Sequence, residues 1–319
     1  MKSVNLQCVG DNQNTGIPSC SWTPSNITGA ILLPKGKSYT VADVATLWTT
    51  LQTDCSVDSA AQRIYPILPF KAIDDQSTDI QIETDGYGGK SFVRDGDYDW
   101  MFEYKNGFCF YQSLRSFHTK NQSWDVLFID EVNNILWGTE DANGDLAGFS
   151  LELLLVPNIK INTGAAATKY YIRFGLNNPA ELNDASYTVS FPVNQQLMKL
   201  SGLLDTYITT STPTIDGGTG VCDLSLNSAC GSVDMAELYA SELADATPAY
   251  CWQAYNVTAA NTVAITGVSV TGSIITITTD TADHAPGDEV DIWFGEVSDA
   301  VAVGITGYAA SPKYRFTVV

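Results

Sequence analysis

The chain has 319 residues, of which 45% are hydrophobic and 16% charged, and this is enough for one large or two modest folded domains. Its 36 acidic residues against 16 basic ones give a formal net charge of −20. Phosphate binding needs a basic surface, so this charge balance argues against a protein that binds nucleic acid tightly. It is compatible with a surface that DNA passes without adhering. The sequence holds no apolar run of about 18 residues, and we therefore predict no membrane contact.

The N-terminal segment and the cysteines bear on where the chain is made. MKSVNLQCVGDNQNTG lacks the apolar core of a secretory signal, and the seven cysteines include no Cys-x-x-Cys spacing. We therefore expect synthesis in a cytoplasm, with most cysteines reduced and acting as small apolar side chains.

The first part of the chain predicts an arm, a helix and short strands. Residues 1–39 are rich in Asn, Ser, Pro and Gly and read as an arm or long loop, with one short strand at 31–33. Residues 40–52 predict an amphipathic helix with Thr40 as its cap. Residues 64–72, broken by two prolines, suit an edge or a connector, and residues 80–83 a short strand.

Residues 92–156 are the predicted framework. Alternation over 97–104 places four aromatic residues on one face of a strand and Asp97, Asp99 and Glu103 on the other. Asn106-Gly107 predicts a tight hairpin turn, with a return strand starting at 108–111. Further strands are expected at 124–130, 135–137 and 149–156, the last apolar on both faces and therefore central. The predicted core residues are Trp100, Phe102, Trp124, Phe128 and Leu153.

The remainder of the chain predicts more strands and two helices. Strands are expected at 169–176 and 187–193, and helices at 197–208 and from Ser232 onward. At about residue 257 lysine and arginine nearly vanish, and short Thr/Val/Ile-rich segments separated by turns predict a small β-sandwich.

The predicted fold is therefore mainly β. Residues 1–256 are expected to form an antiparallel β-sandwich or barrel with an N-terminal arm and one to three flanking helices, and residues 257–319 a separate, small Ig-like β-sandwich.

Catalytic and metal-binding patterns are weak. His118 and His284 fall in different predicted domains without clustered ligands, so no zinc site is expected. Gly88 to Ser91 resembles the end of a phosphate loop, but a strand follows it where a helix is required. Acidic residues at 141–152 partly match a calcium loop, with Leu146 where glycine is expected. We find no Gly-x-Ser-x-Gly and no distinctive carboxylate pair, and predict neither an enzyme nor a cofactor.

Four phrases carry a resemblance to a known family: GYGGKSFVRDGDYDWMFEY, QSLRSF, WDVLFIDEVNNILWGT and NTGAAATKYYIRFGLNNPAELN. In these phrases and in the order of its elements, the chain resembles the major tail (tail-tube) proteins of long-tailed bacteriophages over residues 30–250. The C-terminal segment resembles the Ig-like modules that often decorate such subunits. The resemblance implies a virion tail protein, assembled in the host bacterial cytoplasm, whose stacked rings form a channel. The expected number of subunits in a ring is six.

Its implied partners are other copies of itself, other phage tail proteins and DNA in transit. An acidic channel wall would repel DNA phosphates, and the strand face with Asp97, Asp99 and Glu103 is the leading candidate for that wall. Two alternatives stay open: another virion part, such as a collar, head decoration or fibre base, and a glycan-binding surface module.

Overall fold

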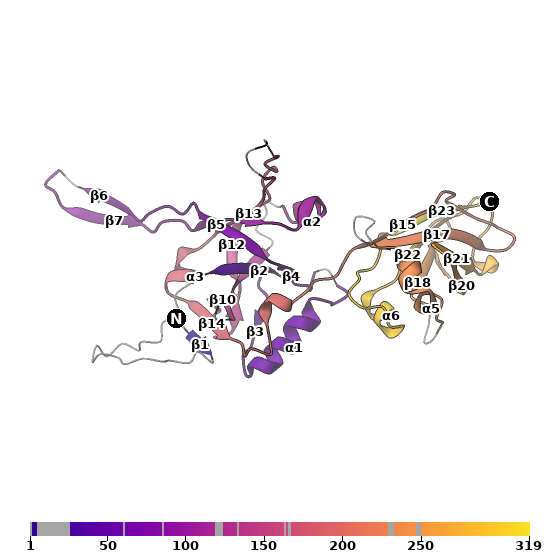
Figure 1. Ribbon diagram of the computed structural model, residues 1–319, viewed down its shortest axis with the longest axis horizontal. Coiled ribbons are helices and arrows are strands. Elements are labelled where there is room, and N and C mark those ends of the chain that lie inside the picture. Colours follow the sequence, from indigo (N-terminus) through magenta and orange to yellow (C-terminus); the bar gives the residue numbers. More distant parts are fainter. Residues whose placement is uncertain are drawn as a thin grey trace. The chain divides into compact units, whose positions relative to one another are not determined.

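The computed structural model describes residues 2–4, 26–59, 61–84, 86–118, 124–132, 134–162, 164, 167–228, 233–246 and 250–319. The chain splits into two compact units (Figure 1). The N-terminal unit is Met1–Cys55 with Ala61–Ser201, and the C-terminal unit is Ser56–Ala60 with Gly202–Val319. Both units are mainly β and mostly antiparallel, which confirms the predicted fold class.

The N-terminal unit contains a twelve-stranded sheet whose main path is β1-β14-β10-β9-β12-β13-β8-β5, and a separate two-stranded sheet, β6-β7. Its strands are β1 (Lys2–Val4), β2 (Ile27–Pro34), β3 (Ser38–Tyr39), β4 (Tyr65–Ile67), β5 (Phe70–Asp75), β6 (Gln81–Thr84), β7 (Lys90–Arg94), β8 (Asp99–Tyr104), β9 (Trp124–Asp130), β10 (Ile135–Glu140), β11 (Leu146–Ala147), β12 (Phe149–Leu155), β13 (Tyr170–Leu176) and β14 (Ser186–Ser190). Its helices are α1 (Val44–Asp54), α2 (Gly107–Arg115), α3 (Pro179–Asn183) and the 3-10 turn η1 (Leu197–Lys199).

This sheet encloses one core and covers a second. Inward aromatic residues of β8 and β13 share a core with one face of β2, β9 and β10, as in a sandwich. The opposite face of β2, β9, β10 and β14 packs against α1, which contributes Val44, Leu47 and Leu51. The central strands are therefore buried on both sides, and burial of this apolar area is the main force that holds the layers together.

Helix α1 begins later than the sequence suggests. Asp43 is its N-cap and accepts a hydrogen bond from the backbone N–H of Thr46 at 3.0 Å, so the cap is Asp43 and not Thr40. The cap hydrogen bonds from Thr46 hold the pKa of the Asp43 carboxyl below its ordinary value. None of the described helices is long and apolar enough to cross a membrane.

The C-terminal unit is a sandwich of two sheets, β15-β17-β21-β20 and β16-β23-β22-β18-β19. Inward residues of both sheets, among them Leu226, Ile277 and Phe294, form one core. Its strands are β15 (Thr206–Thr209), β16 (Thr214–Ile215), β17 (Val221–Ser228), β18 (Trp252–Asn256), β19 (Asn261–Val263), β20 (Ile265–Thr271), β21 (Ile274–Thr279), β22 (Glu289–Phe294) and β23 (Tyr314–Val318). Its helices are α4 (Met235–Leu238), α5 (Ala240–Leu243), α6 (Val297–Ala302) and the 3-10 turn η3 (Thr281–Asp283). The likeness to an Ig-like module stays a prediction.

The predicted boundary at 256/257 is wrong, because the units divide between Ser201 and Gly202. Strand β17 pairs with β21 and strand β18 pairs with β22, so both sides of residue 257 belong to the same two sheets. The change in composition at 257 therefore occurs inside a domain. A chain ended at Asn256 would remove β21, one of the two partners of β17, and both partners of β18.

The predicted hairpin at Asn106-Gly107 is also wrong. Gly107 adopts the left-handed φ of +86° and starts helix α2, which buries Tyr111 and Leu114. Strand β8 already pairs with β5 on one side and β13 on the other. A return strand beside β8 has no free edge to occupy, so the chain leaves as a helix.

The helix predicted at 197–208 is replaced by η1 and strand β15. Leu197 and Leu200 belong to the core against α1, whereas Ile208 belongs to the C-terminal core. Their helical spacing is thus coincidental, since the chain passes between the two units here. The helix expected from Ser232 is two short helices, α4 and α5, separated by Tyr239.

The predicted core residues divide into two groups. Phe102 and Phe128 are fully buried and Trp100 is 7% exposed, as predicted, but Trp124 and Leu153 are only half-buried. A β-bulge between Leu151 and Leu153 shifts the register of β12 against β13, so Leu154 takes the buried position. Glu152 and Leu153 are left on the outer side of a strand that was expected to be apolar on both faces.

Candidate assembly surface

The N-terminal unit carries a long exposed β-hairpin, described over residues 76–84 and 86–98. We call this hairpin the arm; it is distinct from the N-terminal arm predicted for residues 1–39. It continues the β5–β8 ladder, with Gln76 N–H donating to Asp99 O at 2.8 Å and Thr78 N–H to Asp97 O at 2.9 Å, and it ends in the β6–β7 pair. Figure 1 shows the β6–β7 pair projecting from the sheet of this unit. Gly96 is required at the root of the arm, because a Cβ there would lie 1.8 Å from the carbonyl oxygen of Thr78.

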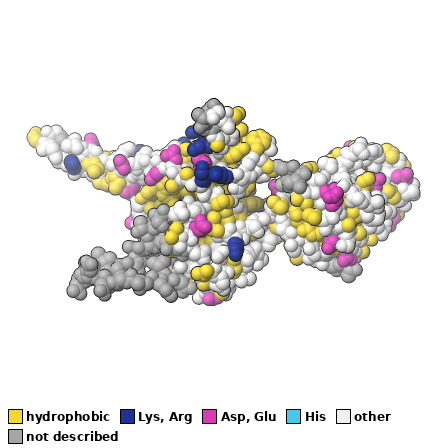
Figure 2. Space-filling view, viewed as in Figure 1, with side chains coloured by type: hydrophobic (Ala, Val, Ile, Leu, Met, Phe, Trp, Pro, Cys, Tyr) yellow, Lys and Arg dark blue, Asp and Glu magenta, His cyan; other side chains and the backbone are white. Residues whose placement is uncertain are grey.

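The arm carries apolar side chains that nothing in the described chain covers. Every described residue of β6 and β7 is exposed. Ile82 and Phe92 are paired across the two strands, so their side chains share one face of the hairpin. Figure 2 shows hydrophobic side chains along this projection. The exposed large apolar residues are Ile80 (57%), Ile82 (58%), Tyr87 (101%), Phe92 (65%) and Val93 (52%).

A hairpin of this kind is marginally stable in water by itself. It also has outer strand edges that do not pair with any other described strand, and such edges add a neighbouring chain readily. Exposed apolar side chains together with unpaired edges are typical of a surface that another polypeptide covers.

The sheet face at the root of the arm is a network of paired charges. Arg173 on β13 binds Asp99 on β8 through two hydrogen bonds, one of 2.7 Å from Nε to Oδ1. Glu103, which is 7% exposed, accepts from Lys169 Nζ at 2.9 Å and from Lys71 Nζ at 3.4 Å. Figure 2 shows basic side chains gathered in this region of the unit.

The pKa of Glu103 reports the balance of these contacts. Burial by itself would raise that pKa, but the hydrogen bonds from Lys169 and Lys71 outweigh burial, and the pKa of Glu103 is lowered. Hydrogen bonding to Asp99 likewise raises the pKa of Arg173. Glu103 is therefore held as a carboxylate with two ammonium partners.

The structure thus separates the three predicted lumen-facing acids. Asp97 is exposed at the root of the arm, whereas Asp99 and Glu103 are bound to basic side chains of neighbouring strands. Their place in a channel wall stays a prediction. The sequence pattern of this segment does not reveal Lys71 of β5, Lys169 or Arg173 of β13, the basic residues that bind Asp99 and Glu103.

The negative charge of the chain is concentrated in the C-terminal unit. That unit holds 15 of the 36 acidic residues but only two of the 16 basic ones, a net charge of −13, and the N-terminal unit holds 21 and 14, a net charge of −7. Figure 2 shows acidic side chains scattered over the C-terminal unit. The N-terminal unit is therefore the less acidic of the two.

The described residues provide little for metal chemistry. No group of three or more His, Cys, Asp or Glu side chains in the described ranges could hold a metal ion. In the 141–152 segment, the Asp141 carboxylate accepts from the N–H groups of Asn143 and Asp145 at 2.8 and 2.9 Å and so caps a hairpin turn. The hydrogen bond from Asp145 and then that from Asn143 lower the pKa of Asp141, which is the behaviour of a turn residue.

The two histidines have local structural partners. His118 Nδ1 lies 3.5 Å from the N–H of Val156, and buried His284 Nε2 lies 2.8 Å from the Thr279 hydroxyl.

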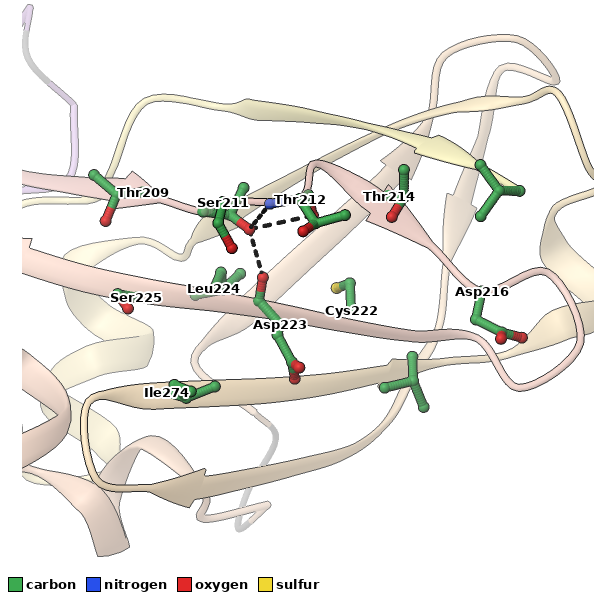
Figure 3. A pocket seen from close by; sticks show the side chains of 13 residues that line it. Thr209, Ser211, Thr212, Thr214, Asp216, Cys222, Asp223, Leu224, Ser225 and Ile274 are labelled. Atoms are coloured by element: carbon green, nitrogen blue, oxygen red, sulfur yellow. Dashed lines mark hydrogen bonds between the residues drawn. The ribbon is translucent and has the colours of Figure 1, made fainter.

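A groove with many hydroxyl groups lies on the C-terminal unit, between the end of β15 and strand β17, with a volume of about 460 Å³ (Figure 3). Several of its hydroxyls form hydrogen bonds within the protein. Thr210 donates to the carbonyl oxygen of Asp223 at 2.8 Å and accepts from the N–H of Thr212, and Ser225 donates to Ser273 O at 2.8 Å. These contacts tie the end of β15 and the turn before β21 to strand β17, and we therefore interpret the groove as a structural feature.

Comparison with protein-family models finds no match, and no curated protein sequence is similar to the chain. The candidate surface therefore depends on the geometry of the arm alone. Sequence reasoning identified its strands as short separate elements but missed the arm. The sequence feature that could have predicted the arm is the pair of apolar segments at 80–83 and 92–93 on either side of a glycine-rich segment. These two segments pair as one hairpin whose side chains are exposed.

Proposed function

We propose that this chain is a structural virion subunit that self-assembles into stacked rings, the tail tube of a long-tailed bacteriophage. The observation that carries the proposal is the arm, a hairpin with exposed apolar side chains and unpaired edges that is stabilised when another subunit covers it. The sequence resemblance supplies the specific form of the assembly, and the two-core β unit with a helix on one face agrees with it.

The proposed partners follow from the same reasoning. Copies of the chain contact one another within and between rings, other tail proteins close the ends, and DNA passes through without specific binding. The excess of acidic residues in both units disfavours adhesion of DNA phosphates. The residues that line the channel are the ones that must repel DNA. Among Asp97, Asp99 and Glu103, only Asp97 has an exposed carboxylate.

The experiment compares purified full-length protein with two variants by sedimentation velocity and negative-stain microscopy. The arm variant is Ile82→Ser/Phe92→Ser, and the matched control is Val301→Ser, a 48% exposed apolar residue of α6 in the C-terminal unit. We expect rings or tubes from the wild type and the control. The arm variant should stay a folded monomer. Serine removes the apolar contact with a neighbouring subunit, and because both positions are exposed, the substitutions leave the cores of the subunit intact.

A wild-type protein that sediments as a monomer at high concentration in every buffer contradicts self-assembly. Small closed oligomers that never stack would favour a collar or decoration protein over a tube. Rings that form equally well from the arm variant would show that the arm is not the assembly surface.

A further inference from the structure

The C-terminal unit has one long strand edge that no other described strand covers. Strand β20 pairs with β21 over residues 265–271 and with no other described strand, so it ends its sheet. The other edge strands of the two sheets, β15, β16 and β19, have only four, two and three residues. Short edge strands offer little to a neighbouring chain, whereas a long one is a template for strand addition. Strand β20 is therefore the edge of this unit best suited to bind a further strand.

The hydrogen-bonding groups at this edge follow from the β20–β21 hairpin. Thr271 and Ile274 pair across a two-residue turn, and such a flanking pair is hydrogen-bonded. Because bonded and non-bonded positions alternate, Ser269 also faces β21, and the N–H and C=O groups of Val268 and Val270 face the open edge. Both valines pack on the core from the inner face of the sheet but are only half-buried. The edge thus offers backbone donors and acceptors together with apolar surface.

The charge around β20 favours a basic partner. Residues 257–279, which include β20, contain no charged side chain. Helix α5 packs against β20 and carries Glu242, and Asp245 follows this helix. The two basic residues of the unit, Lys313 and Arg315, lie beside and on β23 in the other sheet. A strand that binds at this edge therefore meets a negative potential and no basic side chain of the same sheet.

The arm supplies a strand of this kind in β7, whose sequence is Lys-Ser-Phe-Val-Arg. Strand β7 pairs only with β6 among the described strands, so one of its edges is open. Lys90 and Arg94, without an acidic residue, give β7 a charge of +2, whereas β6 carries Glu83 and no basic residue. Phe92 and Val93 are 65% and 52% exposed, and Lys90 lies two residues from Phe92, on the same face. Strand β7 therefore combines the positive charge, the apolar side chains and the open edge that suit β20.

We propose that strand β7 of one subunit adds to the open edge of β20 in the C-terminal unit of another subunit. This inference rests on the proposed function and names the surface that receives the arm. Backbone hydrogen bonds join β7 to Val268 and Val270, and Phe92 lies beside these half-exposed valines. Lys90, on the same face as Phe92, then points to the side of the sheet where α5 lies, and its ammonium attracts Glu242. Because the two surfaces differ, the contact is head-to-tail and can repeat from subunit to subunit.

The experiment uses the full-length arm variant, Ile82→Ser/Phe92→Ser, and two full-length variants of β20. Val268→Pro removes an N–H from the open edge, where proline leaves the β20–β21 ladder intact. Ser269→Lys adds a positive charge at an exposed position beside the site of β7. Thr262→Lys, at an exposed position of β19 in the other sheet, makes the same change of charge and is the control. In sedimentation velocity each β20 variant should be a monomer, folded by circular dichroism, whereas the wild type and the control should assemble.

Mixing the variants tests the direction of the contact. The arm variant keeps an intact β20, and each β20 variant keeps an intact arm. An equimolar mixture should therefore form dimers that do not grow, because the arm and the β20 edge left over are both defective. Lys90→Glu in the β20 variant should weaken these dimers at least about tenfold, and added salt should reduce that difference.

Wild-type protein that stays monomeric in every buffer would contradict the proposed function, and this inference with it. Wild-type rings together with rings from both β20 variants would overturn the inference alone, since the arm would then bind elsewhere. A mixture of folded variants that stays monomeric would also overturn it, and so would dimers of the arm variant by itself, because β20 would then pair with a second β20. If Val268→Pro fails to fold, Ser269→Lys decides the matter, because it changes an exposed side chain.

Discussion

Two adjacent leucines of β12 provide a direct test of the structure. Leu154 is 2% exposed and belongs to the sandwich core, whereas Leu153 is half-buried on the outer side and packs over Gly175, where a Cβ would lie 3.2 Å from the Leu153 Cβ. The two residues are chemically identical and differ only in the face that the bulge assigns to them. We therefore compare Leu153→Ala with Leu154→Ala.

The expected magnitudes follow from burial. Truncation of a fully buried leucine to alanine costs about 2–5 kcal/mol, the sum of lost transfer free energy and the cavity that remains. We expect about 3 kcal/mol for Leu154→Ala and about 1 kcal/mol for Leu153→Ala, since part of the Leu153 side chain stays in contact with water in the folded protein. For a unit of this size, roughly 2–4 °C of Tm per kcal/mol gives a loss of roughly 6–12 °C against roughly 2–4 °C.

Differential scanning calorimetry of the unassembled full-length protein measures both values. The two units have separate cores, so two transitions are expected, and the transition of the C-terminal unit serves as an internal control that neither variant should move. Equal losses for the two variants, or a larger loss for Leu153→Ala, would show that the bulge is misplaced and that the strand keeps a simple alternation.

The remaining predictions concern charge and thiols. Burial raises the pKa of the Asp125 carboxyl, so this group lowers the stability of the fold progressively as the pH rises from the pKa of the unfolded state through the higher pKa of the folded state. Asp125→Asn should therefore weaken this pH dependence in urea titrations and stabilise the protein at pH 7. A variant that is less stable than the wild type at pH 7 would refute the prediction. Glu103→Lys should destabilise the N-terminal unit, because it would place three ammonium groups together, those of the new lysine, Lys71 and Lys169. Asp97→Lys, at an exposed position, should leave Tm nearly unchanged. Equal losses of Tm for the two variants would show that Glu103 is as solvated as Asp97. Burial raises the pKa of three free thiols, those of Cys55, Cys222 and Cys251, to about 12. Their alkylation by iodoacetamide at pH 8 should therefore require unfolding. Rapid labelling of the native protein, detected by peptide mass spectrometry, would contradict their burial.

Local patterns predicted the identity of many elements. The strands predicted at 124–130 and 169–176 are confirmed as β9 and β13. In the second of them the alternation follows directly from the pleat. Phe102 and Phe128 are buried as predicted, since aromatic residues on one face of a strand have few alternatives to a core.

The predictions that failed required knowledge of neighbours. Asn106-Gly107 forms a hairpin turn in many sequences, but here both edges of β8 are occupied and the chain continues as α2. Leu197 and Ile208 share helical spacing but enter different cores. The candidate surface was missed for the same reason: the sequence shows two apolar segments around a turn, and only the structure shows that they lie beyond any core.

The sequence by itself determined the class of the protein: mainly β, acidic in total, without a recognisable catalytic motif. These properties depend on composition and on the two-residue period, which each segment carries within itself. The tertiary structure decided where the units divide, which leucine of β12 is buried, and that Asp99 and Glu103 are paired with basic residues. Those features depend on contacts between strands far apart in the chain, and the free energy of such contacts is set by register and packing, which local sequence does not encode.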